Sequence, residues 1–282
     1  MPVCREAAST SASIELRPGG RFLVASSSSP HGQGHDITFA QIAADRLQVP
    51  LQDIELRFGD SATTPAGVGT FGSRSVAMAG SAVAVAAERL VQRARAETAA
   101  TAEKAAIDWP ALATTDPPLR ATAEWRSPHA FSSGAYLARI AIDRGTGVLT
   151  VEGLVAVDDA GVLINPLLVH GQVVGGAVQA LGECLTEEAV HDAEGQMRSA
   201  SLLDYRLLTA AEIPPIVTGE VQTPSPLNPL GAKGAGEGGA VGTLAAVANA
   251  VTDALGGRHV DPPYTAEKLW RILHEAPKAS RA

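Results

Sequence analysis

The sequence contains few of the residues from which metal clusters and disulfide frameworks are built. Only two of its 282 residues are cysteines, Cys4 and Cys184, and their separation fits neither a zinc motif nor an iron–sulfur motif. Two cysteines also exclude a disulfide framework, so we expect two reduced thiols in a cytoplasmic protein.

Clustered positive charge and long apolar runs are missing as well. The net charge is −8 at pH 7, and no block of five or more consecutive Lys and Arg residues occurs. Nucleic acid and anionic membranes are therefore poor partners. No uncharged stretch of 18 apolar residues is present, so we expect no membrane span, and the N-terminus has no apolar segment of a secretory signal.

Aromatic residues are scarce at 4%, whereas 45% of the residues are apolar and 18% are charged. This balance predicts a folded protein whose core depends on Ala, Val, Leu and Ile. The 28 glycines and 18 prolines favour loops that approach a ligand closely. The length suits one large domain or two lobes.

Strand and helix patterns are mixed without strict alternation, which predicts an α+β fold of two mixed α/β lobes. In the first half we expect a hairpin over 12–28, a helix over 36–47 capped by Asp36 or Thr38, a strand over 53–60 and a helix over 75–106.

In the second half of the sequence, the residue pattern predicts a pair of strands, three helices and one further strand. We expect two strands joined at Gly145–Gly147, a helix within 162–188, a strand within 204–223, a helix after Glu237 and a last helix over 264–275. The division predicted from this pattern is a first lobe over 1–110, a proline-rich linker over 111–124 and a second lobe over 125–282.

A glycine-rich loop over 67–72 matches the pattern G-x-G-x-x-G. The residues before it do not form a buried strand and no βα unit surrounds it, which disfavours a Rossmann dinucleotide site. The loop still offers backbone N–H groups, the hydroxyls of Ser73 and Ser75 and the guanidinium of Arg74 at a helix start, a set that suits an anion. The structural alternative is a glycine-rich helix entry with a solvated arginine.

Two further glycine-bearing segments carry a glutamine. In the loop HGQGH over 31–35, two glycines between the histidines argue against a helical metal site, and Gln33 has the donors and the acceptor that a heterocycle edge needs. Gln172 follows Gly171 at an expected helix start. For this second segment the residues alone favour close helix packing over small side chains.

The stretch GAKGAGEGG over 231–239 surrounds Glu237 with five glycines, directly before an apolar helix. A glutamate in the first turn of a helix is common, because the helix N-terminus stabilises it. Glycine at this density also lets the backbone lie against a bulky ligand, and a carboxylate held there suits a general base. No motif for a serine or cysteine nucleophile competes with it. Together the loops predict one large ligand with a phosphate-like end, a heterocycle and a reactive end.

Five sequence blocks carry a more specific resemblance. They are HGQGHDITFAQIAADRLQVPLQDIELRFGDS, GTFGSRS, VDDAGVLINPLLVHGQVVGGAVQALGE, SLLDYRLLTAAEIPPI and TPSPLNPLGAKGAGEGGAVGTLAAVANAVTDAL. In this order they resemble the C-terminal half of the molybdenum-binding large subunit of the xanthine dehydrogenase/aldehyde oxidase/carbon monoxide dehydrogenase family. The resemblance covers nearly the whole chain and is weakest over 93–125.

The resemblance implies a molybdopterin cofactor with molybdenum, in the cytosine dinucleotide form of bacterial members, and no direct protein ligand to the metal. The residues that match the family's cofactor loops are Gln33, Gly34 and His35 in the first loop, Thr70, Gly72, Ser73, Arg74 and Ser75 around the pyrophosphate and nucleotide, Gln172 beside the pterin, and Lys233 and Gly234 near the molybdenum. Glu237 matches the catalytic glutamate.

The implied activity is oxidative hydroxylation of an aldehyde or an N-heterocycle, with water as the oxygen source and Glu237 as the general base. The family's large subunit is far longer, and its first half supplies another cofactor-binding domain and much of the substrate pocket. We therefore expect a split subunit that works with a chain carrying the N-terminal half, with an iron–sulfur subunit and with an FAD subunit. The alternative is a truncated, non-catalytic homologue that serves as a binding or assembly module, and the sequence leaves both open.

Overall fold

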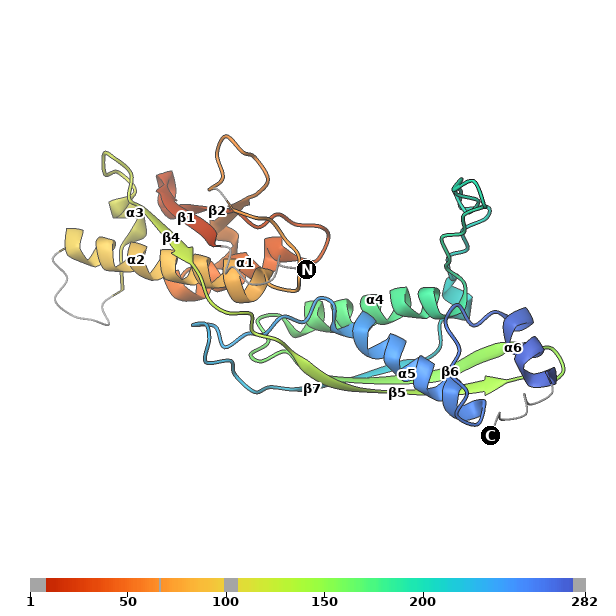
Figure 1. The fold of residues 1–282 in the computed structure, drawn as a ribbon. Coiled ribbons are helices and arrows are strands. Elements are labelled where there is room, and N and C mark those ends of the chain that lie inside the picture. Colours follow the sequence, from red (N-terminus) through yellow and green to blue (C-terminus); the bar gives the residue numbers. More distant parts are fainter. Residues whose placement is uncertain (1–8, 66, 99–105, 276–282) are drawn as a thin grey trace. The chain divides into compact units, whose positions relative to one another are not determined.

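In this computed structural model, which describes residues 9–65, 67–98 and 106–275, the chain forms two compact units (Figure 1). Unit 1 comprises Met1–Ser132, Asp159–Val169 and Gln222–Ala235, and unit 2 comprises Ser133–Asp158, His170–Val221 and Gly236–Ala282. Each unit combines helices with a sheet, which confirms the mixed α/β fold. The chain passes between the units more than once, so the division differs from the expected boundary near residue 125.

The sheet of unit 1 has four strands in the order β3-β2-β1-β4. They are β1 (Thr10–Arg17), β2 (Arg21–Ser26), β3 (Ile54–Arg57) and β4 (Arg120–Trp125). The hairpin expected over 12–28 is confirmed, because β1 and β2 pair antiparallel around a tight turn at Pro18–Gly20, with Ile14 opposite Val24. β3 joins β2 in parallel, and β4 joins the other edge of β1 antiparallel.

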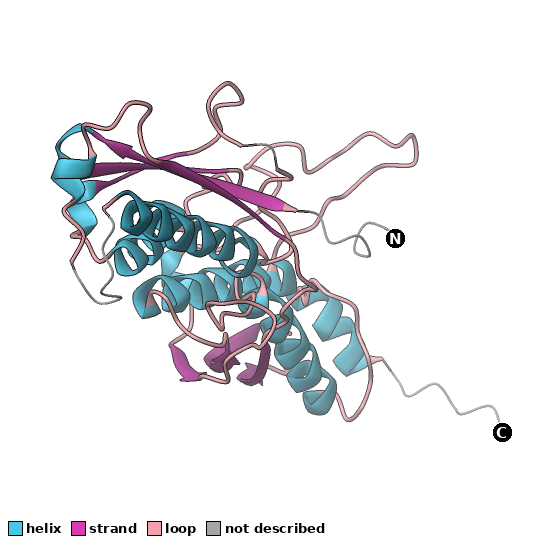
Figure 2. Cartoon of the chain, turned by 90° about the vertical axis from the view of Figure 1, so that its left-hand side faces the viewer, coloured by secondary structure: helices cyan, strands magenta, loops and turns pink. Residues whose placement is uncertain are grey.

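Two helices pack on one face of this sheet, as Figure 2 shows: α1 (His35–Leu47) and α2 (Ser81–Glu97). The expected caps of α1 are wrong, because its N-cap is Gly34 and the Thr38 hydroxyl donates to the Gly34 carbonyl oxygen at 3.0 Å instead. The core between sheet and helices contains Phe22, Phe39 and many alanines, as the composition predicts.

The helix expected over 75–106 differs from the structure at both ends. It begins with a π-helical turn over Val76–Gly80 before α2. α2 ends at Glu97, where the amide of Thr98 donates to the carbonyl oxygens of Ala94 and Ala96, and residues 99–105 lie outside the described part of the chain.

Residues 111–124 are not a linker, because they belong to unit 1. They contain the end of a short helix, α3 (Trp109–Leu112), and most of β4. The Trp109 ring packs edge-on against Phe22 with ring centroids 5.0 Å apart, and Ala121 and Ala123 of β4 are buried in the same core. The prolines that indicated a linker occupy only α3 and the turn between α3 and β4.

Unit 2 contains a three-stranded sheet in the order β5-β6-β7, formed by β5 (Ser133–Ile142), β6 (Leu149–Asp159) and β7 (Ile216–Val221). The expected pair of strands joined at Gly145–Gly147 is confirmed, and the turn places Gly147 at a φ of 73°. The helices are α4 (Pro166–Leu185), which starts in unit 1, α5 (Gly238–Ala254) and α6 (Ala266–His274).

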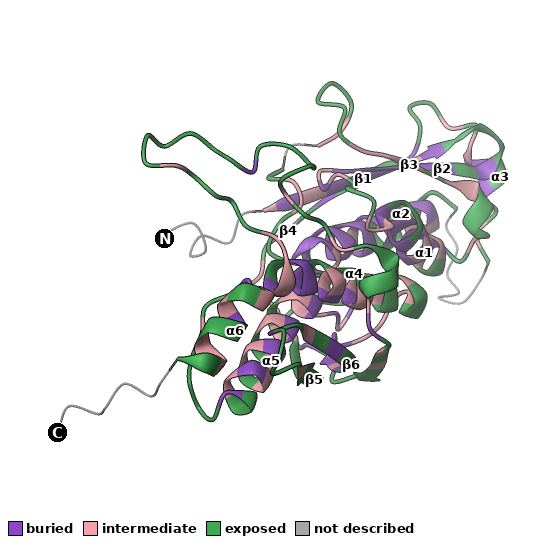
Figure 3. Cartoon of the chain, turned by 90° about the vertical axis from the view of Figure 1, so that its right-hand side faces the viewer, coloured by how far each residue is buried: buried purple, intermediate pink, exposed green. Residues whose placement is uncertain are grey.

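Helix α5 packs on β5, and Figure 3 shows buried, intermediate and exposed residues along α5. The buried sides contribute Val247, Val251 and Leu269 to the core of unit 2, next to Leu181 and Cys184 of α4. No helix in the described ranges has the length and apolar character needed to cross a membrane.

Candidate functional site

Two glycine-rich loops of unit 1 meet in a cluster of hydroxyl groups. Ser28 Oγ lies 2.8 Å from Thr70 Oγ1 and donates to Ser75 Oγ at 3.1 Å, and Ser75 Oγ donates to Thr70 Oγ1 at 3.2 Å. Thr70 Oγ1 in turn donates to the carbonyl oxygen of Ser29 at 2.8 Å. Thr70 and Ser75 were expected here, whereas Ser28 was missed, because a run of four serines carries no positional signal.

The backbone of the second loop is left-handed at three positions, Gly69 with a φ of 79°, Gly72 with 58° and Ser73 with 54°. Backbone of this kind directs successive N–H groups into a concave anion-binding surface. A Cβ atom placed on Gly69 or Gly72 would have no neighbour within 4 Å, so this side of the loop is open. The π-helical turn follows directly, and such turns occur frequently at functional sites.

Arg74 is buried in unit 1 at 5% exposure. Its Nη2 donates to Thr10 Oγ1 at 3.1 Å, and its guanidinium lies 5.1 Å from the centroid of the Phe71 ring. Burial lowers the pKa of Arg74 from its ordinary value. The solvated arginine of the structural alternative is therefore wrong, and the charge is held at a defined place beside the loop.

His35, the first residue of α1, is also buried, and its ring stacks on Phe39 with centroids 4.8 Å apart. Within the described chain its Nδ1 atom has no hydrogen-bond partner. Burial, assisted by the neighbouring His31, lowers the pKa of His35 to about 4, so the ring is neutral at pH 7. The Gln33 carboxamide oxygen accepts a hydrogen bond from the His31 amide within the same loop.

Glycines allow two close approaches between segments of unit 1. A Cβ atom on Gly34, whose φ is 75°, would lie 2.6 Å from Cδ1 of Leu168. A Cβ atom on Gly234 would lie 2.4 Å from the carbonyl oxygen of Ser73, and the Gly234 amide donates to the Ala130 carbonyl oxygen at 2.8 Å. Segment 231–235 therefore lies against the loop that carries Gly72 to Ser75.

Lys233 forms an ion pair that sequence analysis missed. Its Nζ lies 2.8 Å from Oδ2 of Asp159, and the two side chains are only 15% and 13% exposed. The other Asp159 oxygen, Oδ1, accepts from the amides of Gly161 at 2.9 Å and Thr223 at 3.0 Å. The Lys233 ammonium and these amides hold the pKa of Asp159 well below its usual range. The signal in the sequence is the acidic pair at 158–159, just before a glycine turn.

In unit 2, Glu237 is the N-cap residue of α5, as expected, and its carbonyl oxygen accepts from the Val241 amide at 3.1 Å. The Glu237 side chain makes no cap hydrogen bond to the first turn and is exposed. Its carboxylate is therefore not used in the capping role that a first-turn acid commonly has.

Gln172 lies in the second turn of α4, because the helix begins earlier than expected, at Pro166. Two neighbouring glycines, Gly171 and Gly175, have nothing within 4 Å of a Cβ position and leave that side of α4 open. Gly176 instead touches α5, since a Cβ atom there would lie 2.9 Å from the Ala240 amide nitrogen. Close helix packing therefore explains one glycine of this segment, while the other two are open.

The expected site residues divide between the units. Unit 1 holds Gln33, Gly34, His35, Thr70, Gly72, Ser73, Arg74, Ser75, Lys233 and Gly234, and unit 2 holds Gln172 and Glu237. Throughout the described ranges, no three or more His, Cys, Asp or Glu side chains are grouped so that they would hold a metal ion. The groups that these residues contribute are backbone amides, hydroxyls, carboxamides, one buried imidazole and the charged side chains of Arg74, Lys233 and Glu237.

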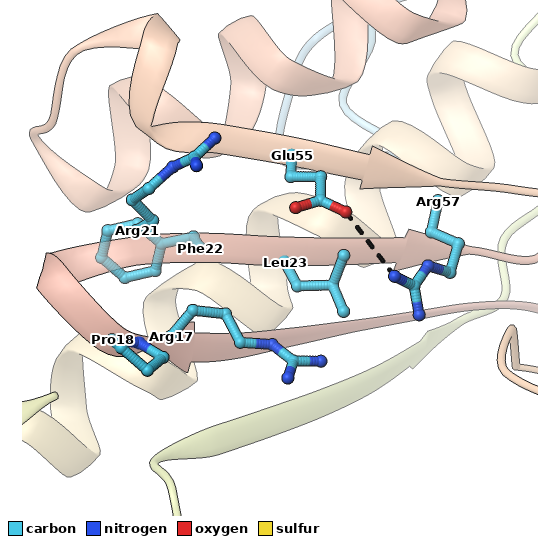
Figure 4. A pocket seen from close by; sticks show the side chains of 7 residues that line it. All are labelled: Arg17, Pro18, Arg21, Phe22, Leu23, Glu55 and Arg57. Atoms are coloured by element: carbon cyan, nitrogen blue, oxygen red, sulfur yellow. Dashed lines mark ion pairs between the residues drawn. The ribbon is translucent and has the colours of Figure 1, made fainter. Parts of the chain in front are cut away.

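A separate hollow lies on the sheet of unit 1 (Figure 4). It is lined by Arg17, Pro18, Arg21, Phe22, Leu23, Glu55 and Arg57. Two of its arginines are engaged in ion pairs, Arg57 with Glu55 at 3.6 Å and Arg17 with Glu15 at 3.3 Å. No residue of this hollow belongs to the glycine-rich loops, so it is distinct from the candidate site.

Comparison with known proteins identifies the family of this chain. A family model described as molybdopterin cofactor-binding domain matches residues 2–214. The carbon monoxide dehydrogenase large chain of Hydrogenophaga pseudoflava is 34% identical over 94% of this chain and 37% of its own length. The nicotine 6-hydroxylase large subunit of Paenarthrobacter nicotinovorans is 34% identical over 92% of this chain and 36% of its own length.

A solved structure agrees with these relatives. Quinoline 2-oxidoreductase from Pseudomonas putida 86 superposes with a TM-score of 0.86 at 33% identity, over 96% of this chain and 39% of that one. This chain thus spans less than two-fifths of the relatives it matches. With the matched model extending over most of its residues, the chain belongs to the molybdopterin cofactor-binding domains of molybdenum hydroxylase large subunits, in the family of xanthine dehydrogenase and carbon monoxide dehydrogenase.

Proposed function

We propose that this chain is the molybdopterin-binding C-terminal part of a molybdenum hydroxylase subunit. The complete enzyme would oxidatively hydroxylate an aldehyde or an N-heterocycle, with water as the oxygen source and Glu237 as the general base. The observation that carries this proposal is the meeting of glycine-bearing segments 28–35, 69–75 and 231–235 in unit 1, in a chain of this family. Relatives named after nicotine and quinoline support the heterocyclic substrate class.

The residues present fit a phosphate-bearing heterocyclic cofactor. The left-handed backbone at 69–73 offers N–H donors to a pyrophosphate, as in the cytosine dinucleotide form, and the Ser28, Thr70 and Ser75 hydroxyls hold the two loops together beside it. The buried Nδ1 of His35, which lacks a partner in the described chain, is a polar atom that a bound group would satisfy. Beside Gln172, the open positions at Gly171 and Gly175 leave room for a ring.

The bound molybdenum cofactor would supply the two-electron redox chemistry, which no side chain of this protein provides. Glu237 would accept the proton released in the reaction, since it is an exposed carboxylate at the start of α5. The surrounding glycines would let substrate and cofactor approach the backbone at 234–239.

The remaining wall of the pocket would come from the rest of the molybdenum subunit, since the relatives are more than twice as long as the matched part. We propose that a polypeptide carrying this N-terminal half, an iron–sulfur subunit and an FAD subunit complete a cytoplasmic enzyme. This chain has two cysteines, too few to hold the clusters itself.

Purification of the chain with its co-eluting partners tests the proposal. We expect about one molybdenum and one released cytosine nucleotide per chain, measured by elemental analysis and chromatography after denaturation. Thr70→Val should lower the nucleotide content, whereas Thr114→Val, whose hydroxyl donates to the Ala111 carbonyl oxygen away from these loops, should not. A monomer that carries neither molybdenum nor nucleotide would overturn the proposal.

The second candidate is a non-catalytic binding or assembly module. The observation that favours it is that the glycine-bearing loops that meet in unit 1 suit binding, whereas Glu237 belongs to unit 2. A purified complex that contains the cofactor but shows no turnover sensitive to Glu237→Gln would support this module instead of the enzyme.

A further inference from the structure

Beneath the first turn of α5, two side chains of unit 2 form a hydrogen-bonded pair. Tyr136 of β5 donates from Oη to Oδ2 of Asp158, near the end of β6, at 2.5 Å. Asp158 is only 7% exposed. A carboxylate withdrawn from water to this extent is costly unless a donor or a positive end of a dipole compensates its charge.

Three glycines make room for this pair. A Cβ atom on Gly242 of α5 would lie 2.3 Å from Cδ2 of Tyr136, so the ring lies directly against the helix backbone. On Gly238, the first residue of α5, a Cβ atom would lie 3.2 Å from Oδ1 of Asp158. On Gly134 it would lie 2.6 Å from the same oxygen. Gly238 and Gly242 are four residues apart and therefore share one face of α5.

Two carboxylates lie near the positively polarised start of α5, and they differ in their relation to it. The N-terminus of a helix carries a partial positive charge, and an acid near the first turn normally stabilises it. The Glu237 side chain makes no cap hydrogen bond, whereas the buried Asp158 carboxylate lies against Gly238. Burial and Asp158 raise the pKa of Tyr136, so its phenol stays protonated and continues to donate.

We propose that Tyr136 is a positioning residue for Glu237. By holding the Asp158 carboxylate under the first turn, Tyr136 sets where α5 begins, and Glu237 is the residue directly before that point. Asp158 compensates the partial positive charge of the helix N-terminus, a role that the Glu237 side chain does not take by capping. The inference rests on the proposed general-base role of Glu237, because positioning matters for turnover only if that carboxylate takes part.

Hydrogen exchange tests the positioning without any cofactor. The Val241 amide, which donates to the Glu237 carbonyl oxygen, reports on the backbone at Glu237. In the purified full chain, Tyr136→Phe should speed its exchange about tenfold, the effect of losing one hydrogen bond to a charged group. Tyr205→Phe is the matched control, because Tyr205 Oη also donates to a carboxylate, Oε2 of Glu187 at 2.6 Å, and both residues lie outside β5, β6 and α5.

Asp158→Asn is the second variant, and it keeps the side-chain volume if Tyr136→Phe fails to fold. It should speed exchange at Val241 in the same way. Unchanged exchange at Val241 in either folded variant, or equal acceleration in Tyr205→Phe, would overturn the proposal.

In the assembled enzyme, Tyr136→Phe should lower kcat about tenfold with KM within about twofold, since a small misplacement of a catalytic group slows the chemical step. A change in KM alone would contradict the positioning role. The two proposals fail separately: full turnover in Glu237→Gln would remove the general base, while faster Val241 exchange in Tyr136→Phe would still show that Tyr136 orders the start of α5.

Discussion

The Lys233 ammonium group lies 2.8 Å from the Asp159 carboxylate, and both side chains are largely withdrawn from water. Lys233 stands four residues before Glu237, and Asp159 ends strand β6. The pair therefore anchors segment 231–235 of unit 1 to the end of β6. The Asp159 carboxylate also accepts from the amides of Gly161, just after β6, and of Thr223, after β7.

Lys233→Met should destabilise unit 1, because it leaves the Asp159 carboxylate without its cation. We expect a loss of about 2 kcal/mol, below the cost of breaking a fully buried pair, since both groups keep some contact with water. Urea denaturation measures the change. The control is Arg126→Met, which breaks an exposed pair with Glu124 and should cost less than about 1 kcal/mol. Equal losses in the two variants would contradict the anchoring role.

The same ion pair predicts a dependence on acid. The pKa of Asp159 is lowered from 3.8 in the folded chain, so the unfolded chain binds the proton first as the pH falls. The stabilisation is complete well above this value and declines as the pH falls below about 5. Asp159→Asn should therefore unfold with a shallower pH dependence than the wild type between about pH 5 and 2. A parallel decline in both proteins would show that the pair contributes nothing.

His35 predicts a second acid-sensitive step at higher pH. Its pKa is lowered from 6.5 to about 4 by burial, so the unfolded chain takes up a proton that the folded chain excludes between these values. Stability should fall by up to about 3 kcal/mol as the pH drops from 6.5 to 4. Urea midpoints of His35→Gln should change less over this range than those of the exposed control His191→Gln. The same slope in both variants would exclude His35 as the cause.

Gly234→Ala should move segment 231–235 away from the loop at 72–75. The added Cβ would lie 2.4 Å from the Ser73 carbonyl oxygen, a backbone atom that has to shift with its loop. We expect a loss of about 1–3 kcal/mol in thermal or urea denaturation, together with less molybdenum per purified complex. Gly153→Ala is the control, since its Cβ would meet only the Pro215 carbonyl oxygen at 3.8 Å. Full stability and full molybdenum content in Gly234→Ala would contradict this close approach.

Glu237→Gln should keep the cofactor and lose turnover by several orders of magnitude, because a carboxamide cannot accept the proton. Molybdenum content, released nucleotide and kcat should be measured on the same preparation. Glu220→Gln, an exposed acid of β7, serves as the control. Near-normal turnover in Glu237→Gln would remove the general-base role while leaving the cofactor-binding proposal in place.

Several elements were predictable because their signals are local. Pro18–Gly20 forms the turn between β1 and β2, and the apolar spacing over 36–47 produced α1. The helix after Glu237 was likewise predictable, because a long apolar run begins directly after this residue. The alternation, spacing and turn residues behind these predictions act over a few positions of the chain.

The boundary between the units was not predictable in this way. β4 pairs with β1, more than one hundred residues earlier, so its small residues Ala121 and Ala123 carried no local sign of a core strand. The prolines nearby indicated a linker instead. The crossings of the chain between the units likewise depend on contacts between distant segments.

The sequence by itself determined the family, the glycine-rich loops and the position of Glu237 at a helix start, because motif order, backbone freedom and helix propensity are properties of short segments. Only the tertiary structure decided which groups these segments meet. It buried Arg74 beside Thr10, paired Lys233 with Asp159 and placed Tyr136 and Asp158 under α5. Burial and hydrogen bonding of these charged groups depend on neighbours from distant parts of the chain, and such contacts exist only once the chain has folded.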